Sequence, residues 1–407
     1  MISKSYRLLN YLNRSHGRFT RLLVGQLAWV GSWLASRDPA LANWAKQCFL
    51  RDDFKQGVRF CAWLARVSWP FLHVWEDRFF DFTQGAKGDL LVAMQQFLEK
   101  HRGRQPELVF LSDQLFVLAA EVHDTIETYQ GDPEAVSAVM HRYKVMADHL
   151  LKAIETTQKQ ARPAKTSRRK GDFVQADAEK ALRDFATLLP KEQWPWYLVS
   201  GTFLGLYRDG GFMAHDYDID VGINADKVDH EALLQQLKSQ QLFVVKKVDY
   251  HLEVAQNSSG YYALHSYPSL YKLVHETGIN VDVFIHYREG AVLWHGSVIH
   301  RWDNQAFGLA EYELAGITVL GPDNPETYLT ENYGDWRTPI TNFDCTTGTP
   351  NLVVARNYLS VALFLKRLGH YVGRDAVQYQ QLRRALLSSR VLKEQNEHLH
   401  FVNFFSL

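Results

Sequence analysis

The chain has 407 residues, of which 46% are hydrophobic and 13% aromatic, so two domains with sizeable cores can form. Its formal net charge is +0, which argues against a nucleic-acid partner held by charge alone. The three cysteines are too far apart for a dense disulfide framework or a CxxC zinc cluster: Cys48, Cys61 and Cys345. This cysteine usage predicts a reducing, cytoplasmic setting.

The most apolar early stretch, Leu22–Ala35, is shorter than the roughly 20 residues that span a bilayer. It lies behind too long a polar, basic segment for an ordinary signal peptide. We expect a buried core helix here. The alternative is an amphipathic segment that lies on anionic lipid and holds the protein peripherally at the inner membrane, since arginines flank it: Arg14, Arg18, Arg21 and Arg37.

Residues 1–160 are predicted to form an all-helical domain in which no chemistry can be assigned. Apolar residues recur at spacings of three and four through 111–129, which is typical of an amphipathic helix. Asp132 and Pro133 then supply an N-cap and a first-turn proline for another helix. The polar, basic stretch 161–172 predicts a linker.

The centre of the chain is the stretch 199–223, which reads VSGTFLGLYRDGGFMAHDYDIDVGI. An apolar run, 196–199, predicts a buried strand that ends in the small residues Ser200, Gly201 and Thr202. Small residues at such a turn allow the backbone to approach a phosphate. A helix-length segment and a glycine pair follow.

Two carboxylates then alternate along a short predicted strand, so that Asp218 and Asp220 lie on one face. Like charges this close repel unless a cation lies between them, and hard oxygen ligands suit Mg²⁺ or Mn²⁺. Asp282 is a lone carboxylate in the apolar strand predicted at 279–287, and burial requires that it have a partner. A metal shared by the three aspartates would provide one.

The later elements predict a mixed sheet with helices on one side, an α+β fold. A helix is expected near 225–240, with Asn224 or Asp226 as its cap. The segment 324–339 is turn-rich and aromatic, and from Leu352 onward the periodicity is helical again. Strands are expected at 242–248, 271–274, 279–287, 291–294, 298–302 and 317–320.

Other site candidates each leave an alternative open. Lys272 in an apolar strand would face phosphate or would extend from the sheet edge to solvent. His215 would bind the donor or carry a proton, or would be structural. Asp216 extends the acidic cluster or caps a turn, and the pair Asp335 and Trp336 forms an acceptor wall or packs within the domain.

The order of a small-residue turn, a pair of aspartates and a later strand aspartate is that of the nucleotidyltransferase fold. The run SGTFLGLYRDGGFMAHDYDIDVGI also resembles the signature of the LicD and fukutin family, GTxLGxxRxxGF followed by an acidic strand. The VDVFI strand and the segments 325–329 and 333–336 resemble that family as well, so the likeness covers 175–339. It implies a catalytic domain at 173–345, followed by a helical C-terminal segment at 346–407.

The resemblance implies a metal-dependent transferase that moves phosphocholine, ribitol phosphate or a similar group from a CDP-linked donor to a hydroxyl of an envelope or capsular glycan. Asp218, Asp220 and Asp282 would hold Mg²⁺ or Mn²⁺, with Asp282 also the candidate base. Arg208 would face the donor phosphate, and Gly201 and Thr202 would form the nucleotide-side turn. The chain departs from the family at 213–215, where many relatives have Ile-Pro-Trp and this chain has Met-Ala-His.

Two other functions remain open at this point. A true nucleotidyltransferase would attach a nucleoside monophosphate and release pyrophosphate. A non-catalytic scaffold would bind glycan or membrane through its helical half without turnover.

Overall fold

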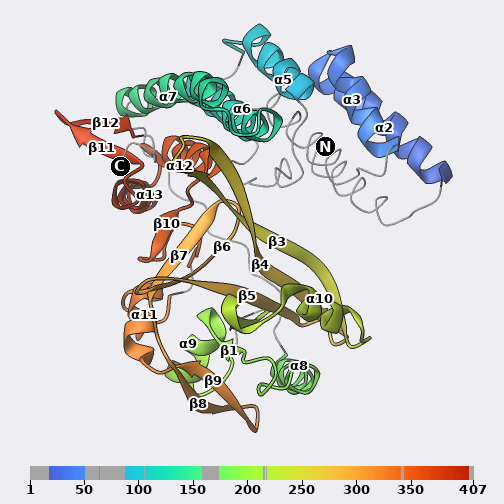
Figure 1. Cartoon of the computed structure of the whole chain (residues 1–407), viewed down its shortest axis with the longest axis vertical. Coiled ribbons are helices and arrows are strands. Elements are labelled where there is room, and N and C mark those ends of the chain that lie inside the picture. The colour runs from blue at the N-terminus through green and yellow to red at the C-terminus, as the bar shows by residue number, and fades with distance from the viewer. Residues whose placement is uncertain are drawn as a thin grey trace. The chain divides into compact units, whose positions relative to one another are not determined.

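The computed structural model describes residues 18–50, 64, 88–104, 106–157, 174–213, 216, 218–340 and 343–402. Residues 161–172 and His215, for which a linker and a site role are predicted, therefore lie outside the described residues. The chain divides into two compact units (Figure 1). The first combines Met1–Pro163, Glu253–His265 and Arg356–Leu407, and the second combines Ala164–Leu252 and Ser266–Ala355.

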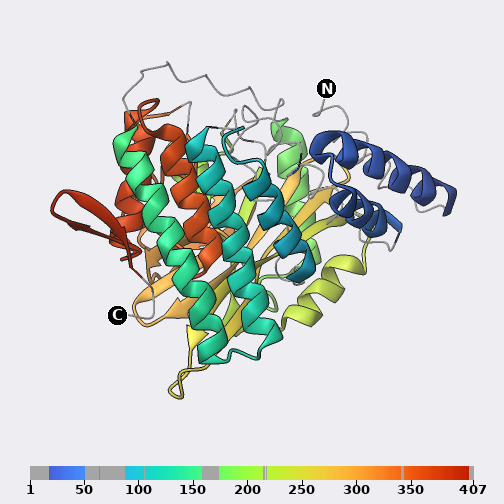
Figure 2. The same ribbon diagram turned by 90° about the horizontal axis from the view of Figure 1, so that it is seen from above.

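The first unit is built mainly from helices, and the predicted helical N-terminal region is confirmed for the described residues. Figure 2 shows α6, α7 and α12, coloured teal, green and red, packed side by side. A two-stranded hairpin, β11 with β12, lies against α7. The elements are α2 (Arg18–Ser36), α3 (Pro39–Leu50), α5 (Gly88–Lys100), α6 (Glu107–Thr128), α7 (Pro133–Thr156), α12 (Tyr358–Tyr371), α13 (Ala376–Ser388), β11 (Leu392–Gln395) and β12 (His398–Phe401).

The predicted start of α7 is confirmed at the level of hydrogen bonds. The Asp132 carboxylate accepts from the Ala135 backbone N–H at 3.0 Å, and Pro133 occupies the first helical position. The cap satisfies one of the N–H groups that a helix start leaves without a partner, and proline has none to lose. The apolar positions of α7 then bury one side of the helix, including Tyr143, whose hydroxyl donates to the Tyr358 carbonyl at 2.9 Å.

The first unit also buries charge between α6 and α12. Asp113 and Lys366 are 0% and 4% exposed, and Lys366 Nζ lies 3.0 Å from Asp113 Oδ1. A buried charge is tolerated only with a partner of opposite sign, because removal from water is costly. This pair therefore fixes the register of α12 against α6.

The second unit is organised around a mixed sheet, as expected for an α+β protein. The strands follow the order β1-β2-β5-β6-β7-β10, with β4 also paired to β5 and β3 to β4. The pair β2 and β5 is parallel and the other described pairs are antiparallel. The strands are β1 (Tyr197–Leu198), β2 (Asp218–Asn224), β3 (Phe243–Gln256), β4 (Tyr262–His275), β5 (Asn280–Glu289), β6 (Val292–Gly296), β7 (His300–Gln305) and β10 (Leu352–Val354).

Helices and a small hairpin cover this sheet and bury its apolar residues. Phe185, Tyr197 and Phe203 are fully buried in one continuous core that also includes the apolar residues of β2 and β5. Figure 1 shows α9 and α11 beside β1 and the hairpin β8–β9. These elements are α8 (Gln175–Leu188), α9 (Ser200–Asp209), α10 (His230–Lys238), α11 (Pro325–Tyr333), β8 (Leu309–Leu314) and β9 (Ile317–Pro322).

The helix expected near 225–240 is shorter, and neither predicted cap is correct. A single 3₁₀ turn, Ala225–Lys227, comes first. Val228 then has an extended backbone, which separates this turn from α10. The cap is Asp229, whose carboxylate accepts from the N–H groups of Glu231 and Ala232 at 2.8 and 2.9 Å. An aspartate directly before the helical turn satisfies these donors better than one three residues earlier.

Several strand and turn predictions also need correction. The strands β3 and β4 have 14 residues each, much longer than expected, and β8 was not predicted. The turn-rich segment 324–339 contains α11, which begins with an Asn324 cap and Pro325. The tail includes β10 and the β11–β12 hairpin besides its helices. Exposed polar residues along these strands hide the alternating pattern on which strand prediction depends.

The predicted helix at Leu22–Ala35 forms as α2, but its expected burial is wrong for most of its large apolar side chains. Phe19, Leu22, Leu27 and Leu34 are among those that are exposed to solvent. No helix among the described residues combines the length and the apolar character that crossing a bilayer requires.

We expect Lys366→Met to lower the free energy of unfolding by about 3–5 kcal/mol, because it leaves the Asp113 carboxylate buried without its cation. The double variant Asp113→Leu with Lys366→Met should recover most of this loss. The control Lys144→Met removes an exposed ion pair with Asp148 and should cost roughly 0.5 kcal/mol or less. Urea unfolding measures all three, and equal losses in Lys366→Met and Lys144→Met would contradict the prediction.

His123 should make the protein less stable in acid. Burial lowers the pKa of this histidine to about 3, while Nε2 accepts from the Tyr358 backbone N–H at 3.3 Å. Between pH 3 and about 6.5 the unfolded chain therefore binds a proton that the folded chain does not, so stability falls as the pH drops. We expect His123 to contribute about 2 kcal/mol of loss between pH 7 and pH 5.

The variant His123→Gln keeps a hydrogen-bond acceptor but does not titrate. Because burial also lowers the pKa of His295, to about 4, the variant should remove only part of the acid sensitivity. Urea unfolding at the two pH values checks this, and an identical pH dependence in variant and wild type would refute the assignment.

Candidate functional site

The predicted site residues meet on neighbouring strands of the mixed sheet. In the parallel pair of β2 and β5, Asp220 is in register with Asp282. In the antiparallel pair of β4 and β5, Lys272 is in register with the same Asp282. Residues in register point to the same face of a sheet, so two carboxylates and an ammonium form one row across three strands. Asp218, two residues before Asp220, lies on this face as well.

The three carboxylates lie close together. Asp218, Asp220 and Asp282 each offer an oxygen, and these oxygens all lie within 4.8 Å of one another. Asp218 and Asp282 are buried and Asp220 is partly buried. Burial, followed by the charges of Asp218, Asp216 and Asp282, raises the pKa of Asp220 well above its usual value, and only the Gly201 N–H opposes this. The donor set of hard carboxylate oxygens fits Mg²⁺ or Mn²⁺.

Lys272 forms an ion pair with this cluster rather than extending from the sheet edge to solvent. Its Nζ donates to Asp282 Oδ2, and its side chain is 37% exposed. One oxygen of Asp282 is thus held by an ammonium in a fixed position. With Asp216 beside them, the carboxylates outnumber the one ammonium of Lys272, so the formal charge of the cluster is negative.

The start of α9 is tied directly to the carboxylate strand. Gly201 N–H donates to Asp220 Oδ2 at 3.2 Å, and Asp220 N–H donates to Thr202 Oγ1 at 2.9 Å. Ser200 has a φ of +48° at the junction of strand and helix. Such a left-handed backbone costs energy in a non-glycine residue and persists only where its surroundings hold it. Gly201 and Thr202, expected to form a small-residue turn, lie in the first turn of α9.

Space around Gly201 is restricted by two aspartates. A Cβ atom on Gly201 would lie 3.2 Å from Asp216 Oδ2 and 3.6 Å from Asp220 Oδ2. Asp216 therefore lies beside the cluster and contributes to its negative charge. The backbone of Gly201 is helical, so a larger residue here would act through this contact and would require Asp216 to shift by a few tenths of an ångström.

Arg208 is held by other protein groups. Its Nε and one terminal nitrogen donate to the two Asp209 oxygens at 2.9 and 2.8 Å, and Nη1 donates to the Trp336 carbonyl at 3.3 Å. The hydrogen bonds to Asp209 raise the pKa of Arg208 above its usual value. The guanidinium is thus tied to the end of α9 and to the backbone of Trp336. A contact with donor phosphate stays a prediction.

Two tyrosines belong to the site that sequence reasoning did not single out. The Tyr328 hydroxyl accepts from the Ser200 N–H at 2.9 Å, and burial raises the pKa of this tyrosine. Burial likewise raises the pKa of Tyr333, with Asp220 and Asp216 adding to the effect. Both tyrosines lie in α11, whose sequence resembled the family, but nothing local marks which side of that helix faces Ser200.

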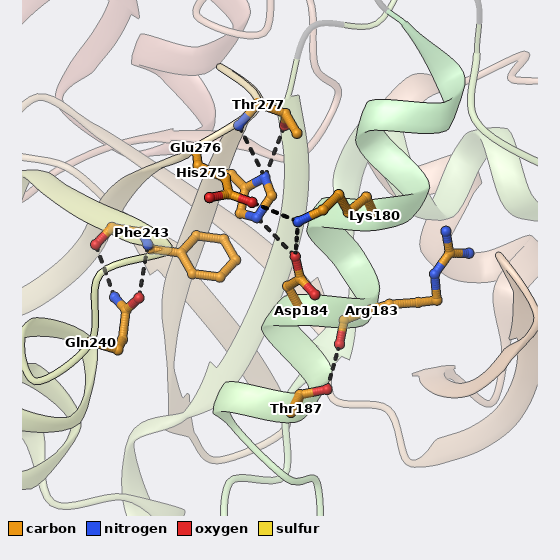
Figure 3. Close-up of polar contacts among 9 residues, drawn as sticks. All are labelled: Lys180, Arg183, Asp184, Thr187, Gln240, Phe243, His275, Glu276 and Thr277. Atoms are coloured by element: carbon orange, nitrogen blue, oxygen red, sulfur yellow. Dashed lines mark hydrogen bonds and ion pairs between the residues drawn. The ribbon is translucent and has the colours of Figure 1, made fainter.

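A second group of ligand-type residues lies between α8 and the end of β4 (Figure 3). His275 Nε2 lies 3.1 Å from an Asp184 oxygen, and Lys180 Nζ reaches Asp184 and Glu276 at 2.6 and 2.7 Å. Hydrogen bonding to Lys180 lowers the pKa of Asp184. The ammonium already occupies the position between the two carboxylates, so this cluster serves as a structural clamp. His275 is part of it.

A cavity of about 390 Å³ lies beside α11 in the same unit. Its lining contains no lysine, arginine or histidine, and none of the three clustered aspartates belongs to it. Tyr328 connects it to the site, because this residue both lines the cavity and contacts Ser200. The lining residues are Gln305, Ala306, Phe307, Gly308, Asp323, Asn324, Thr327, Tyr328 and Glu331.

Comparison with known proteins finds relatives for part of this chain. Residues 193–324 match the family model described as "LicD/FKTN/FKRP, nucleotidyltransferase domain". Ribitol-5-phosphate transferase FKTN of Mus musculus is 26% identical over 184 residues, 43% of this chain and 35% of that protein. The human protein of the same name is 24% identical over 184 residues, 43% of this chain and 36% of that protein.

An uncharacterized protein of Rickettsia prowazekii is 25% identical over 164 residues, 38% of this chain and 53% of that protein. The chain thus spans between about a third and a half of the length of these relatives. Asp218, Asp220 and Asp282 all lie inside the matched range. Residues 193–324 of this chain are therefore similar to the LicD/fukutin family, as the sequence motifs predicted.

Proposed function

We propose that the chain is a metal-dependent transferase that moves a phospho-alcohol from a CDP-linked donor to a hydroxyl of a cell-surface glycan and releases CMP. The observation that supports this most directly is the cluster of Asp218, Asp220 and Asp282, with oxygens within 4.8 Å of one another. The likeness of residues 193–324 to proteins named ribitol-5-phosphate transferase supports the kind of group transferred.

The three aspartates would hold Mg²⁺ or Mn²⁺. Such an ion would neutralise the diphosphate and stabilise the CMP leaving group. In the transfer, the acceptor oxygen bonds to the distal phosphorus, the bond from that phosphorus to the CMP oxygen breaks, and the acceptor hydroxyl loses its proton. Lys272 keeps Asp282 oriented through one carboxylate oxygen, which leaves the other oxygen available as a ligand or a proton acceptor.

The start of α9 would receive the donor phosphates in this scheme. The partial positive charge of a helix N-terminus favours phosphate, although the N–H groups of Ser200 and Gly201 already donate to Tyr328 and Asp220. Gly201 has no Cβ, which lets Asp216 and Asp220 approach the start of the helix. Ser200 is positioned by its hydrogen bond to Tyr328. Arg208 would add a positive charge one helix length away.

The glycan acceptor would bind in the cavity beside α11. Amide, hydroxyl and carboxylate groups line it together with the partly exposed aromatic ring of Phe307. Such groups suit a sugar, whose hydroxyls form hydrogen bonds and whose ring faces pack on aromatic side chains. Without a basic residue in its lining, the cavity does not suit the diphosphate of the donor.

A nucleotidyltransferase that releases pyrophosphate is the second candidate, because the matched family model is described by that activity. Both reactions would use the same carboxylates, and the released product separates them. CMP indicates transfer of the phospho-alcohol, and pyrophosphate indicates transfer of the nucleotide.

We expect the protein to release CMP from CDP-choline, CDP-ribitol or CDP-glycerol in the presence of Mg²⁺ and a glycan acceptor. Asp220→Asn should lower turnover at least ~100-fold. The matched control is Asp226→Asn, which changes an exposed aspartate two residues beyond β2 and should leave turnover unchanged. Absence of CMP with every donor, or equal rates in both variants, would count against the function.

The same pair of variants gives a test that does not depend on the substrate. Asp220→Asn removes charge repulsion from the cluster, so without divalent cation its melting temperature should exceed that of the wild type. Mg²⁺ or Mn²⁺ should raise the melting temperature of the wild type and of Asp226→Asn but not of Asp220→Asn. A wild type that does not respond to either cation would refute the metal site.

Gly201→Ala tests the approach of phosphate to α9. The added methyl group lies tightly against Asp216, so we expect turnover to fall at least ~10-fold while the helix keeps its stability. The control is Gly31→Ala, at a helical glycine whose Cβ would meet nothing within 4 Å. Steady-state turnover and thermal unfolding check both variants, and wild-type turnover in Gly201→Ala would exclude the proposed phosphate position.

A further inference from the structure

The helix α2 carries its large apolar side chains on the outside. Seven of them are between 42% and 80% exposed, which is unusual for a helix of a water-soluble protein. We call them the apolar face of α2: Phe19, Leu22, Leu23, Leu27, Val30, Trp33 and Leu34.

These side chains form one continuous surface. At 100° per residue they fall within an arc of about 140° around the helix axis. Trp29 at its border stacks with Trp33, with ring centroids 6.3 Å apart. Gln26 is the one polar side chain within the arc.

The opposite side of α2 packs on α3 (Figures 1 and 2) and consists mainly of small residues, together with Val24 and Arg21. Ala28 and Ser32 are buried there, and a Cβ on Gly25 would lie 3.5 Å from the Leu50 side chain. Trp29 Nε1 donates to Asn43 Oδ1 at 3.0 Å across the same contact. The usual pattern is therefore inverted, since the small residues lie inside and the large apolar residues outside.

The sequence around this face is basic although the whole chain is neutral. Residues 1–50 contain seven lysines and arginines and one acidic residue, Asp38. Asp38 is engaged as a cap, because its carboxylate accepts from the Ala40 N–H at 2.9 Å. Neither α2 nor α3 contains an acidic residue. A matching partner therefore has an apolar interior that accepts these side chains and a negatively charged surface that attracts the basic residues.

We propose that the apolar face of α2 binds the surface of a bilayer that contains anionic lipid. A helix with a large apolar face and basic flanks lies in the interface, with its apolar side chains among the acyl chains and its cations at the headgroups. Trp33 suits that boundary, since its ring is apolar and its N–H is polar. A second copy of this chain fits less well, because two equally basic regions would repel each other.

The test uses the full chain and sedimentation with vesicles, and requires no enzymatic turnover. We expect binding to phosphatidylcholine vesicles with roughly 30% phosphatidylglycerol and much weaker binding to phosphatidylcholine alone. Raising the salt from about 0.1 M to about 0.5 M should weaken the electrostatic part. The double variant Leu27→Gln with Leu34→Gln should bind at least ~10-fold more weakly, because two apolar anchors are lost.

Matched controls are Val145→Gln on α7 and Val377→Gln on α13, which alter exposed valines away from α2. They should bind like the wild type, and thermal unfolding should show every variant to be folded. Wild-type protein that stays in the supernatant, or equal loss in all variants, would overturn the proposal. Sedimentation velocity checks the alternative partner, a second copy of the chain. The proposal would also be overturned if the wild type bound no vesicles but formed a dimer that the double variant on α2 abolished.

Discussion

The sheet brings three carboxylates together at the site, and the rest of the second unit must offset their mutual repulsion. The parallel pairing of β2 with β5 sets Asp220 beside Asp282, and the alternation along β2 adds Asp218 to the same face. A folded chain does not gain stability from such an arrangement, and the raised pKa of Asp220 records its cost. The surrounding core must supply the energy, as is usual where a site is built for a ligand.

The neighbouring elements hold this arrangement rigidly. The core of the second unit encloses the apolar residues of β2 and β5 on the sheet's other face and along their length. At the site, Asp220 is fixed from two directions, by the Gly201 N–H on its carboxylate and by Thr202 on its own N–H. Ser200 keeps its left-handed backbone through Tyr328. A binding site held by helices and strands positions its groups more accurately than one on loops.

Three charged clusters of the protein differ in how their charge is balanced. Lys366 pairs with Asp113 in the first unit, and Lys180 lies between Asp184 and Glu276 in the second. Both clusters contain their cation within the chain and serve to hold helices in place. The charges that act on Asp220 are instead those of other carboxylates. Lys272, the cation nearby, pairs with Asp282 and not with Asp220. This difference, more than the number of acidic residues, distinguishes a ligand site from a structural clamp.

The sequence by itself determined which carboxylates meet at the site: alternation placed Asp218 and Asp220 on one face, and the apolar surroundings of Asp282 required a partner for it. The Asp132 cap and the helical N-terminal region followed in the same way, because these signals act over a few residues. Only the tertiary structure decided that Lys272 pairs with Asp282, that Tyr328 supports Ser200, and that α2 turns its large side chains outward. Each of these depends on which distant segment packs against which face, and apolar spacing marks a helix face without saying whether it meets protein or another medium.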